Sequence, residues 1–331
     1  MYDFVKYHAL GNDYLVIDPQ RIDLLGLPST AQAARLLCDR HFGIGADGVL
    51  LGPVGAVRAG EPVVLRAFNS DGSVCGRSAN GLRIFALYLS QYHQGARDVL
   101  IRTLAGDTAV RIEDFDEGIA RVEMGRPTFA AADIPAQDLP GPVVARPLDV
   151  AGRQLQVTCL NNGNPHTVVP LPEVSAALAH EVGPLIAGHP AFPERTNVQF
   201  MRVLDRETVE IEIWERGAGY ALASGSSACA AASAAHALGL VDHVVRVRMP
   251  GGAFETAIDA QGAVTLSGAS EQVAAGFLAP RLRARLGLPA VPDTAVPDTA
   301  VPDPPVTGTP APDTDTSRPT AAASAAQGTA A

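Results

Sequence analysis

The chain has 331 residues, of which 47% are hydrophobic and 18% are charged, so it can bury a sizeable core, and its length fits two domains better than one. Its formal net charge is −10; five aspartates and one arginine beyond residue 289 leave about −6 on the rest, which argues against a nucleic-acid-binding surface. No stretch approaches the roughly 20 apolar residues of a membrane span, and the first residues lack a secretory-signal pattern. These features predict a cytoplasmic protein with no membrane partner.

The four cysteines show no CxxC or Cys/His metal-ligand spacing, so the sequence predicts no metal site. In an intracellular chain, scattered cysteines are expected as small buried hydrophobic side chains. Cys75 is the exception, because it lies in a glycine-rich loop three residues before Ser78.

The N-terminal half shows an α+β pattern rather than a regular alternation of strands and helices. Strands are expected where β-branched and aromatic residues cluster between turn residues, and helices where apolar residues recur at helical spacing. In chain order the expected elements are strands at 4–7 and 14–18, a helix at 31–40, strands at 49–52 and 63–69, a helix at 82–92, and short strands at 110–112 and 120–124.

The second half repeats this order of elements before the composition changes. The expected elements are a strand at 155–160, a helix near 174–187, strands at 197–204 and 209–214, a helix at 228–240, and strands at 244–249, 254–258 and 264–267. Beyond residue 289 the sequence AVPDT repeats and a Pro, Thr, Ala and Asp-rich run follows. Such a composition buries too little apolar surface to offset the entropy of ordering, which predicts a disordered tail.

Two short segments form a matched pair, residues 77–81 (RSANG) and 223–227 (ASGSS). Each lies between a strand-like run and a helix of small residues, so each is expected to be a helix N-terminus. A helix N-terminus offers unpaired N–H groups and a partial positive charge, which suits a carboxylate, but serine is also an ordinary N-cap. Asparagine-rich loops elsewhere in the chain favour the carboxylate-binding interpretation, because amides hydrogen-bond both ammonium and carboxylate groups.

Seven motifs identify a resemblance to a known family. They are residues 8–14 (HALGNDY), 40–48 (RHFGIGADG), 68–73 (FNSDGS), 80–83 (NGLR), 163–166 (GNPH), 194–197 (ERTN) and 214–219 (WERGAG). The chain resembles diaminopimelate epimerases, within the superfamily that also holds proline racemase and the phenazine-pathway isomerase. The matches run in the family's order from about residue 4 to about residue 280.

The resemblance implies two pseudo-symmetric domains, each a mixed β-sheet wrapped around a central α-helix. One would comprise residues 1–122 with 271–284 returning to it, the other residues 123–270, and the disordered tail residues 285–331. It also implies a homodimer that needs no cofactor and acts on a small amino acid with a second polar head. The implied reaction converts LL-2,6-diaminopimelate to the meso isomer, a step of lysine and peptidoglycan precursor biosynthesis.

The same resemblance assigns roles to individual residues. In the family, two cysteines open the two central helices and exchange the α-proton; the matching positions here are Ser78 and Ser224. The implied substrate-binding residues are Asn12, Asn69, Ala79, Asn80, Asn164, Asn197, Glu215, Arg216, Gly225 and Ser226.

Serine at these two positions changes the expected chemistry. If an alcohol ionises ~5 pKa units above a thiol, forming its alkoxide costs roughly 7 kcal/mol more, and a helix dipole returns only ~0.3 to 2 kcal/mol. The proton could instead be taken by Cys75 from a reshaped loop, or by Asp47, His166 or Glu215 as another base. The remaining alternatives are a different isomerase or a dehydratase of the same fold, or an amino-acid-binding protein without catalysis.

Overall fold

The computed structural model describes residues 2–27, 29–58, 60–93, 97–139 and 141–289. The disordered tail expected at 285–331 overlaps the described residues only at 285–289. Leu286, directly after helix α5 (Pro280–Arg285), is buried in an apolar cluster that also contains Leu278. Residues 290–331, which carry the repeats, lie outside the described residues.

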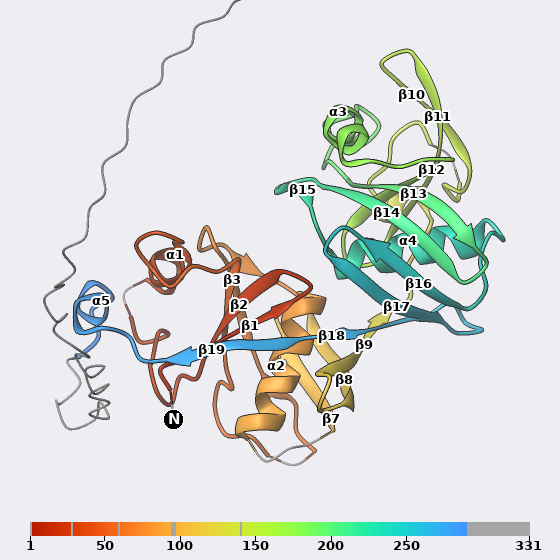
Figure 1. The fold of residues 1–331 in the computed structure, drawn as a ribbon. Coiled ribbons are helices and arrows are strands. Elements are labelled where there is room, and N and C mark those ends of the chain that lie inside the picture. Colours follow the sequence, from red (N-terminus) through yellow and green to blue (C-terminus); the bar gives the residue numbers. More distant parts are fainter. Residues whose placement is uncertain (1, 28, 59, 94–96, 140, 290–331) are drawn as a thin grey trace, which may run out of the picture. The chain divides into compact units, whose positions relative to one another are not determined.

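A six-stranded sheet organises the N-terminal residues (Figure 1). Its order is β19 (Glu271–Gly276), β1 (Phe4–Ala9), β2 (Asn12–Ile17), β3 (Gly48–Leu51), β5 (Arg66–Asn69) and β6 (Val74–Cys75). Only β2 and β3 run parallel, and helix α1 (Thr30–Cys38) connects that pair and packs against β3. The return of β19 to β1 brings residues 271–276 back to the start of the chain.

The second sheet has thirteen strands and runs through both halves of the sequence. Its order is β10 (Arg146–Val150), β11 (Arg153–Asn161), β12 (Pro165–Pro170), β13 (Asn197–Asp205), β14 (Thr208–Glu215), β16 (Val244–Met249), β17 (Gly252–Ile258), β18 (Val264–Ala269), β9 (Ile119–Gly125), β8 (Gly106–Asp114), β7 (Asp98–Thr103) and β4 (Val63–Val64), with β15 (Gly219–Ala221) on β14. The antiparallel pairing of β9 with β18 joins the two halves.

Two buried helices fill the core, α2 (Ala79–Tyr92) and α4 (Gly225–Ala237). Helix α2 packs against β1, β2, β7, β8 and β9, and α4 packs against β11 to β14 and β16 to β18. One apolar cluster contains residues of both helices, while a third helix, α3 (Ala176–Ala187), covers β13 and β14 in a separate cluster. Alanine and serine dominate α4, and such short side chains let strands approach it on all sides.

The expected α+β class, with a long buried helix in each half, is confirmed. The expected strand at 63–69 is divided into β4 and β5. The division falls at Leu65, whose N–H donates to the carbonyl of Arg102. Strands β6, β7, β10, β12, β15 and β19 and helix α5 were not expected. The domain boundary after residue 122 stays a prediction, since the shared sheet and core join the halves.

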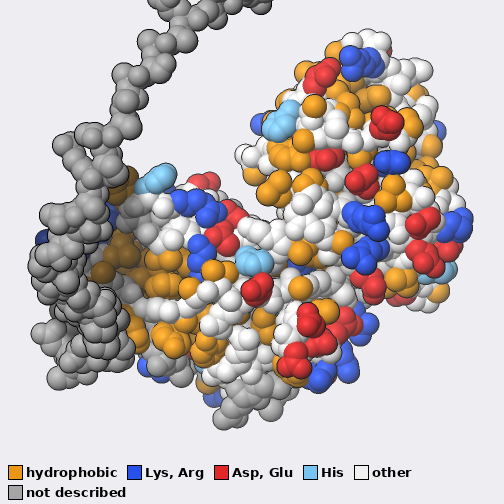
Figure 2. Space-filling view, viewed as in Figure 1, with side chains coloured by type: hydrophobic (Ala, Val, Ile, Leu, Met, Phe, Trp, Pro, Cys, Tyr) orange, Lys and Arg blue, Asp and Glu red, His pale blue; other side chains and the backbone are white. Residues whose placement is uncertain are grey.

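The charged surface is mixed in sign. On the face seen in Figure 2, acidic and basic side chains are interspersed rather than gathered into one large basic region. Within the described ranges, no helix is both long and apolar enough to cross a membrane. The described residues also contain no group of three or more His, Cys, Asp or Glu side chains placed to hold a metal ion.

Candidate active site

Helix α2 begins at a serine whose side-chain oxygen is fully engaged. Ser78 has an extended backbone, and its Oγ accepts a hydrogen bond from the Gly81 N–H at 3.1 Å, which is an ordinary N-cap. The Oη of Tyr14, on β2, lies 3.1 Å from the same Oγ. Tyr14 is placed there by the hairpin between β1 and β2, whose turn residues Leu10 and Gly11 both have positive φ.

Helix α4 begins at a serine with different partners. Ser224 also has an extended backbone, but its side chain makes no capping hydrogen bond to α4. Its hydroxyl lies 3.4 Å from the Ser226 Oγ, and it is near enough to Glu215, the last residue of β14, to lower the pKa of that carboxyl. The two helix N-termini predicted from the paired segments are therefore both present, with unlike surroundings.

The two N-termini lie against each other. A Cβ added at Gly225 would stand 2.8 Å from the Cβ of Ala79, so only glycine fits here. The Asn162 Nδ2 donates to the Ser226 carbonyl at 2.9 Å, and Arg77 donates to the carbonyls of Met124 and Asn162. The structure thus brings the first turns of α2 and α4 together, each with backbone N–H groups available for an anion.

A directed chain of side-chain hydrogen bonds orients Asn12. The Arg83 Nη2 donates to Asn80 Oδ1 at 2.8 Å, Asn80 Nδ2 donates to Asn12 Oδ1 at 3.0 Å, and Asn12 Nδ2 donates to Asp47 Oδ2 at 2.9 Å. Arg83 is fully buried over the Phe254 ring, and this burial lowers its pKa to about 9. Because a guanidinium only donates and a carboxylate only accepts, the chain fixes both amides in one orientation.

An ion cluster supports the carboxylate end of that chain. Asp13 contacts the Lys6 Nζ and the Arg40 Nη2, each at 2.9 Å, and Arg40 also binds Asp47 at 2.8 Å. Burial raises the pKa of the Asp13 carboxyl, but hydrogen bonds from Arg40 and Lys6 outweigh it and hold the pKa below its usual value. Lys6 is the only lysine in the sequence.

A second polar group lies at the ends of β12, β13 and β14. Asn197, which is buried, accepts the Arg216 N–H at 3.1 Å and donates to the Pro165 carbonyl at 3.1 Å. The Arg216 guanidinium donates to Asn164 Oδ1 at 3.4 Å. Asn197 therefore holds the backbone that carries Glu215 and Arg216.

Asn69 is less constrained than the other asparagines. It is exposed, pairs in the sheet with Gly48 and bonds Ser73. Because Asn69 pairs with Gly48, the first residue of β3, it lies beside the residue that directly follows Asp47.

Among the four alternative bases, the surroundings favour Glu215. Burial raises the pKa of Glu215, and the hydrogen bond from Ser224 partly offsets this rise. Burial lowers the pKa of His166 to about 3, which makes its imidazole a weak base, and burial raises the pKa of the Cys75 thiol, which disfavours the thiolate. The Asp47 carboxylate already binds Asn12 and Arg40.

Sequence reasoning missed Tyr14, Arg83 and Asp13. All three lie within the quoted motifs, 8–14 and 80–83, but hydrophobic periodicity marks Tyr14 only as a strand residue. A signal was present for Arg83, because an arginine in the middle of an otherwise apolar helix has to find partners.

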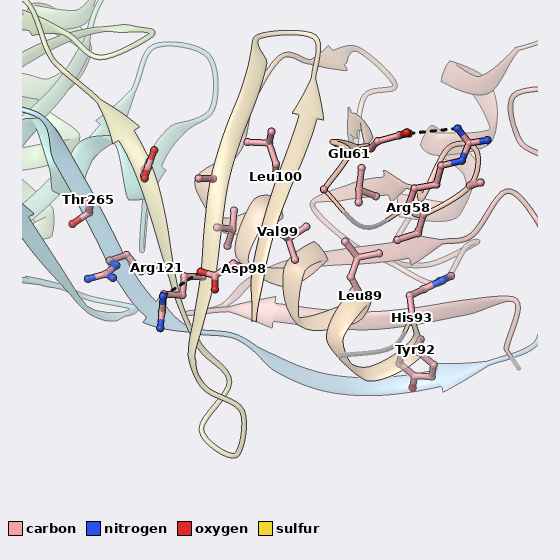
Figure 3. A pocket seen from close by; sticks show the side chains of 18 of the residues that line it. Arg58, Glu61, Leu89, Tyr92, His93, Asp98, Val99, Leu100, Arg121 and Thr265 are labelled. Carbon is pink, nitrogen blue, oxygen red and sulfur yellow. Dashed lines mark hydrogen bonds and ion pairs between the residues drawn. The ribbon is translucent and has the colours of Figure 1, made fainter. Parts of the chain in front are cut away.

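A cavity lies away from these residues. It has a volume of about 1050 Å³ and is lined by residues of β7 to β9 and of the end of α2, among them Leu89, Tyr92 and His93 (Figure 3). Exposed ion pairs, Arg58 with Glu61 and Arg111 with Asp98, lie along its wall. None of the site residues predicted from the sequence lines this cavity.

Known proteins are similar to this chain in sequence over most of its described residues. The family model for diaminopimelate epimerase matches residues 4–130 and 158–273. The chain belongs to the diaminopimelate epimerase family. A relative from this family, diaminopimelate epimerase 2 of Nostoc sp. (strain PCC 7120), is 47% identical over 252 residues, covering 75% of this chain and 86% of its own. The first matched segment contains Ser78, and the second contains Ser224.

Solved structures share the fold at low sequence identity. A predicted epimerase from Pseudomonas aeruginosa superposes with a TM-score of 0.59 at 16% identity, covering 84% of this chain and 99% of its own. A probable proline racemase from Agrobacterium radiobacter K84, solved with bound carbonate, gives a TM-score of 0.58 at 15% identity, covering 84% and 93%. At these identities the likeness establishes the fold of the diaminopimelate epimerase family and nothing finer.

Proposed function

We propose that this protein epimerises LL-2,6-diaminopimelate to the meso isomer without a cofactor. The observation that carries the proposal is the contact between the two helix N-termini at Ala79 and Gly225, with oriented amide, carboxylate and guanidinium groups around it. The similarity to diaminopimelate epimerase 2 of Nostoc supports this substrate. A related isomerisation or a dehydration would give a different product, so the experiment below distinguishes them.

The substrate α-carboxylate would bind the first turns of α2 and α4. Backbone N–H groups of Ala79, Asn80, Gly225 and Ser226 supply donors there, and the two helix dipoles favour the negative charge. Binding at this point also withdraws electron density from the α-carbon, which lowers the barrier to loss of its proton. No metal is needed in this account, because the fixed backbone dipoles meet the charge that develops.

The distal amino-acid group would be held by the asparagines and by Arg216. Asn12, Asn69, Asn164 and Asn197 present amides, and an amide binds both an ammonium and a carboxylate group. Asn12 and Asn197 are held in place by the hydrogen bonds described above, so substrate meets a preorganised surface.

Glu215 is proposed as the base, acting through Ser224. Glu215 can accept a proton without an alkoxide having to form first, so at Ser224 it avoids the roughly 7 kcal/mol that forming a serine alkoxide would add. Ser224 would pass the α-proton to Glu215, and Ser78 would face the α-carbon from the other side. We also propose a cytoplasmic homodimer, the state that the family resemblance implies.

Incubation with LL-2,6-diaminopimelate in deuterated water tests the proposal. The expected result is meso product that carries deuterium at the inverted α-carbon, measured by mass spectrometry and chiral chromatography. The double substitution Ser78→Cys with Ser224→Cys serves as a positive control for the scaffold and should raise the rate. A product of changed mass would favour the dehydratase alternative, and ligand binding with no exchange in either protein would contradict the proposal.

A further inference from the structure

Arg83 is a buried cation without an acidic partner. Its side chain, on α2, has no exposed surface, and no carboxylate among the described residues forms an ion pair with it. Its Nη2 donates to Asn80 Oδ1 at 2.8 Å, whereas its Nε and Nη1 have no hydrogen-bond partner within the described ranges. The guanidinium is therefore only partly satisfied by the protein around it.

The second buried arginine shows what is missing at Arg83. Arg83 and Arg283 are the two arginines that are buried in the described part of the chain, and Arg283 pairs with the Asp3 carboxylate at 2.9 Å. Taking a charge out of water is costly, and a counter-charge usually offsets that cost. At Arg83 the Phe254 ring, 4.5 Å from the Cζ, offsets only part of it. A full counter-charge is absent from the residues around Arg83.

The Arg83 guanidinium lies beside the first turns of both central helices. It bonds the side chain of Asn80, the second residue of α2. The Asn80 Oδ1 is in turn 3.7 Å from the point that a Cβ on Gly225, the first residue of α4, would occupy. Cys229, in the second turn of α4, also acts on Arg83 electrostatically. The unpaired charge is therefore packed next to the two helix N-termini.

Several sources of positive potential meet at this point. Each helix N-terminus carries the equivalent of about half an elementary charge, and Arg83 adds a full one. Arg77, just before the cap of α2, is half-buried, and its guanidinium donates to the backbone carbonyls of Met124 and Asn162. Like charges repel more strongly in a protein interior than in water. The free protein thus holds an excess of positive charge here, which an anion would balance.

We propose that Arg83 supplies the positive charge that binds the substrate carboxylate at the first turns of α2 and α4, and that this carboxylate is the counter-charge that Arg83 lacks in the free protein. Because Arg83 is fully buried, it is a positioning residue that acts through Asn80 and through its charge rather than by touching substrate. The inference rests on the carboxylate site of the proposed function. It adds a residue that the motif assignment of site residues did not contain.

The charge of Arg83 gives the inference a pH signature. Burial lowers the pKa of Arg83 to about 9, so the guanidinium is charged at neutral pH and loses its proton in mild alkali. Cys229 is the titratable group that acts on it, and burial raises the pKa of that thiol to about 12, which keeps it neutral. A carboxylate bound nearby favours the protonated guanidinium. Affinity for the carboxylate should therefore fall as pH rises through about 9.

Calorimetric titration with LL-2,6-diaminopimelate tests the inference on binding, independently of turnover. Arg83→Met replaces the charge with an apolar side chain that suits buried surroundings, so we expect a folded protein. Its Kd near neutral pH should rise by about tenfold or more, because the carboxylate loses a charge in a low-dielectric site. A Kd within about twofold of wild type would overturn the inference.

Arg83→Lys separates the charge from the packing. A lysine keeps the charge, but its ordinary pKa of about 10.4 is lower than that of arginine, and burial lowers it further. The variant should bind nearly as tightly as wild type at about pH 6 and should approach the weak binding of Arg83→Met between about pH 6 and 9. The ammonium groups of the ligand titrate alike in all three proteins. If the affinity of Arg83→Lys followed the wild-type pH profile, charge at this position would not govern binding. This variant also keeps the inference testable if Arg83→Met folds poorly.

Arg283→Met is the matched control, because it removes the other buried arginine, whose partner is Asp3. It should lower stability in thermal unfolding and leave the Kd within about twofold of wild type. Equal weakening by Arg283→Met and Arg83→Met would overturn the inference, since loss of any buried arginine would then suffice. Wild-type protein that binds the ligand without exchange or inversion would contradict the proposed epimerisation and leave this inference standing. Wild-type protein that binds no ligand would overturn both.

Discussion

The first turns of α2 and α4 are alike in sequence and unlike in surroundings. Both begin at a serine with extended backbone, both follow a strand, and both are rich in small residues. At α2 the serine caps its helix and its Oγ lies 3.1 Å from the Tyr14 hydroxyl; at α4 the serine leaves its helix uncapped and lowers the pKa of the nearby Glu215 carboxyl. The two first turns share a backbone conformation, but residues of the neighbouring strands, Tyr14 on β2 and Glu215 on β14, give the two serines different surroundings.

The largest expected effect comes from the acceptor side. Glu215→Gln removes the proposed base and should lower kcat by about 10² to 10⁴ fold, the usual contribution of a positioned acid or base. The measurement is the rate of meso product formation by chiral chromatography.

Glu212→Gln is the matched control, because Glu212 lies on the same strand and binds Tyr220 instead of Ser224. Its kcat should stay near wild type. A Glu215→Gln enzyme with more than about a tenth of wild-type kcat would remove Glu215 from the role of base.

The two halves of the chain also differ in the interactions that hold their polar side chains. Ion pairs hold the group beside Asp47, whereas hydrogen bonds of a neutral amide hold the group at Asn197. Asp13→Asn should destabilise the fold by about 2 to 4 kcal/mol at pH 7, because Lys6 and Arg40 lose a largely buried partner. The pKa of Asp13 is lowered in the folded state, so its contribution is present above the unfolded value of about 3.9 and is lost as pH falls through the folded pKa.

Urea denaturation at several pH values measures this contribution. The stability gap between wild type and Asp13→Asn should be constant near neutral pH and narrow below about pH 4. A gap that grows in acid would contradict the sign of the shift.

Helix capping gives a smaller contrast between the two serines. Ser78→Ala removes a cap, worth about 1 kcal/mol, and leaves the buried Tyr14 hydroxyl unpaired, worth about 1 to 3 kcal/mol. Ser224→Ala removes no cap and should cost less. Thermal unfolding of the two variants should rank Ser78→Ala as the less stable, and the reverse order would mean that the unlike capping does not affect stability.

The smallest expected effect is a shift in pH dependence. Because Glu215 must be ionised to act as base, kcat/KM should fall as pH drops through its pKa, which burial places above the ordinary carboxyl value. Ser224→Ala removes the hydrogen bond that lowers this pKa, so its acid limb should move to higher pH. Residual rates across a pH series measure the limb, and an unmoved or lowered limb would argue against the contact with Glu215.

Local sequence was enough to place both central helices and most strands. It failed for β12, which begins and ends with proline, and for β19, an edge strand whose residues are largely exposed and so lack alternation. Proline and lost alternation both remove the signals by which a strand is recognised.

The hydrogen-bond partners of the site residues could not be predicted from the sequence, for a different reason. Tyr14 and Ser78 are 64 positions apart, and Asn12 and Asn80 are 68 apart. Such contacts depend on how α2 packs on the β1 and β2 hairpin, which no local pattern encodes. A motif that contains Asn12 does not say that Arg83, through Asn80, sets the orientation of its amide.

The position of Lys6 has a practical consequence for labelling. Because the chain has one lysine, amine-reactive reagents meet a single side-chain target; that side chain is 19% exposed, and its amine contacts Asp13. Its rate of acylation would therefore report how often the Lys6 to Asp13 contact opens. The protein carries a built-in chemical probe of the cluster that supports Asn12, with no engineered residue and no bound dye in the site itself.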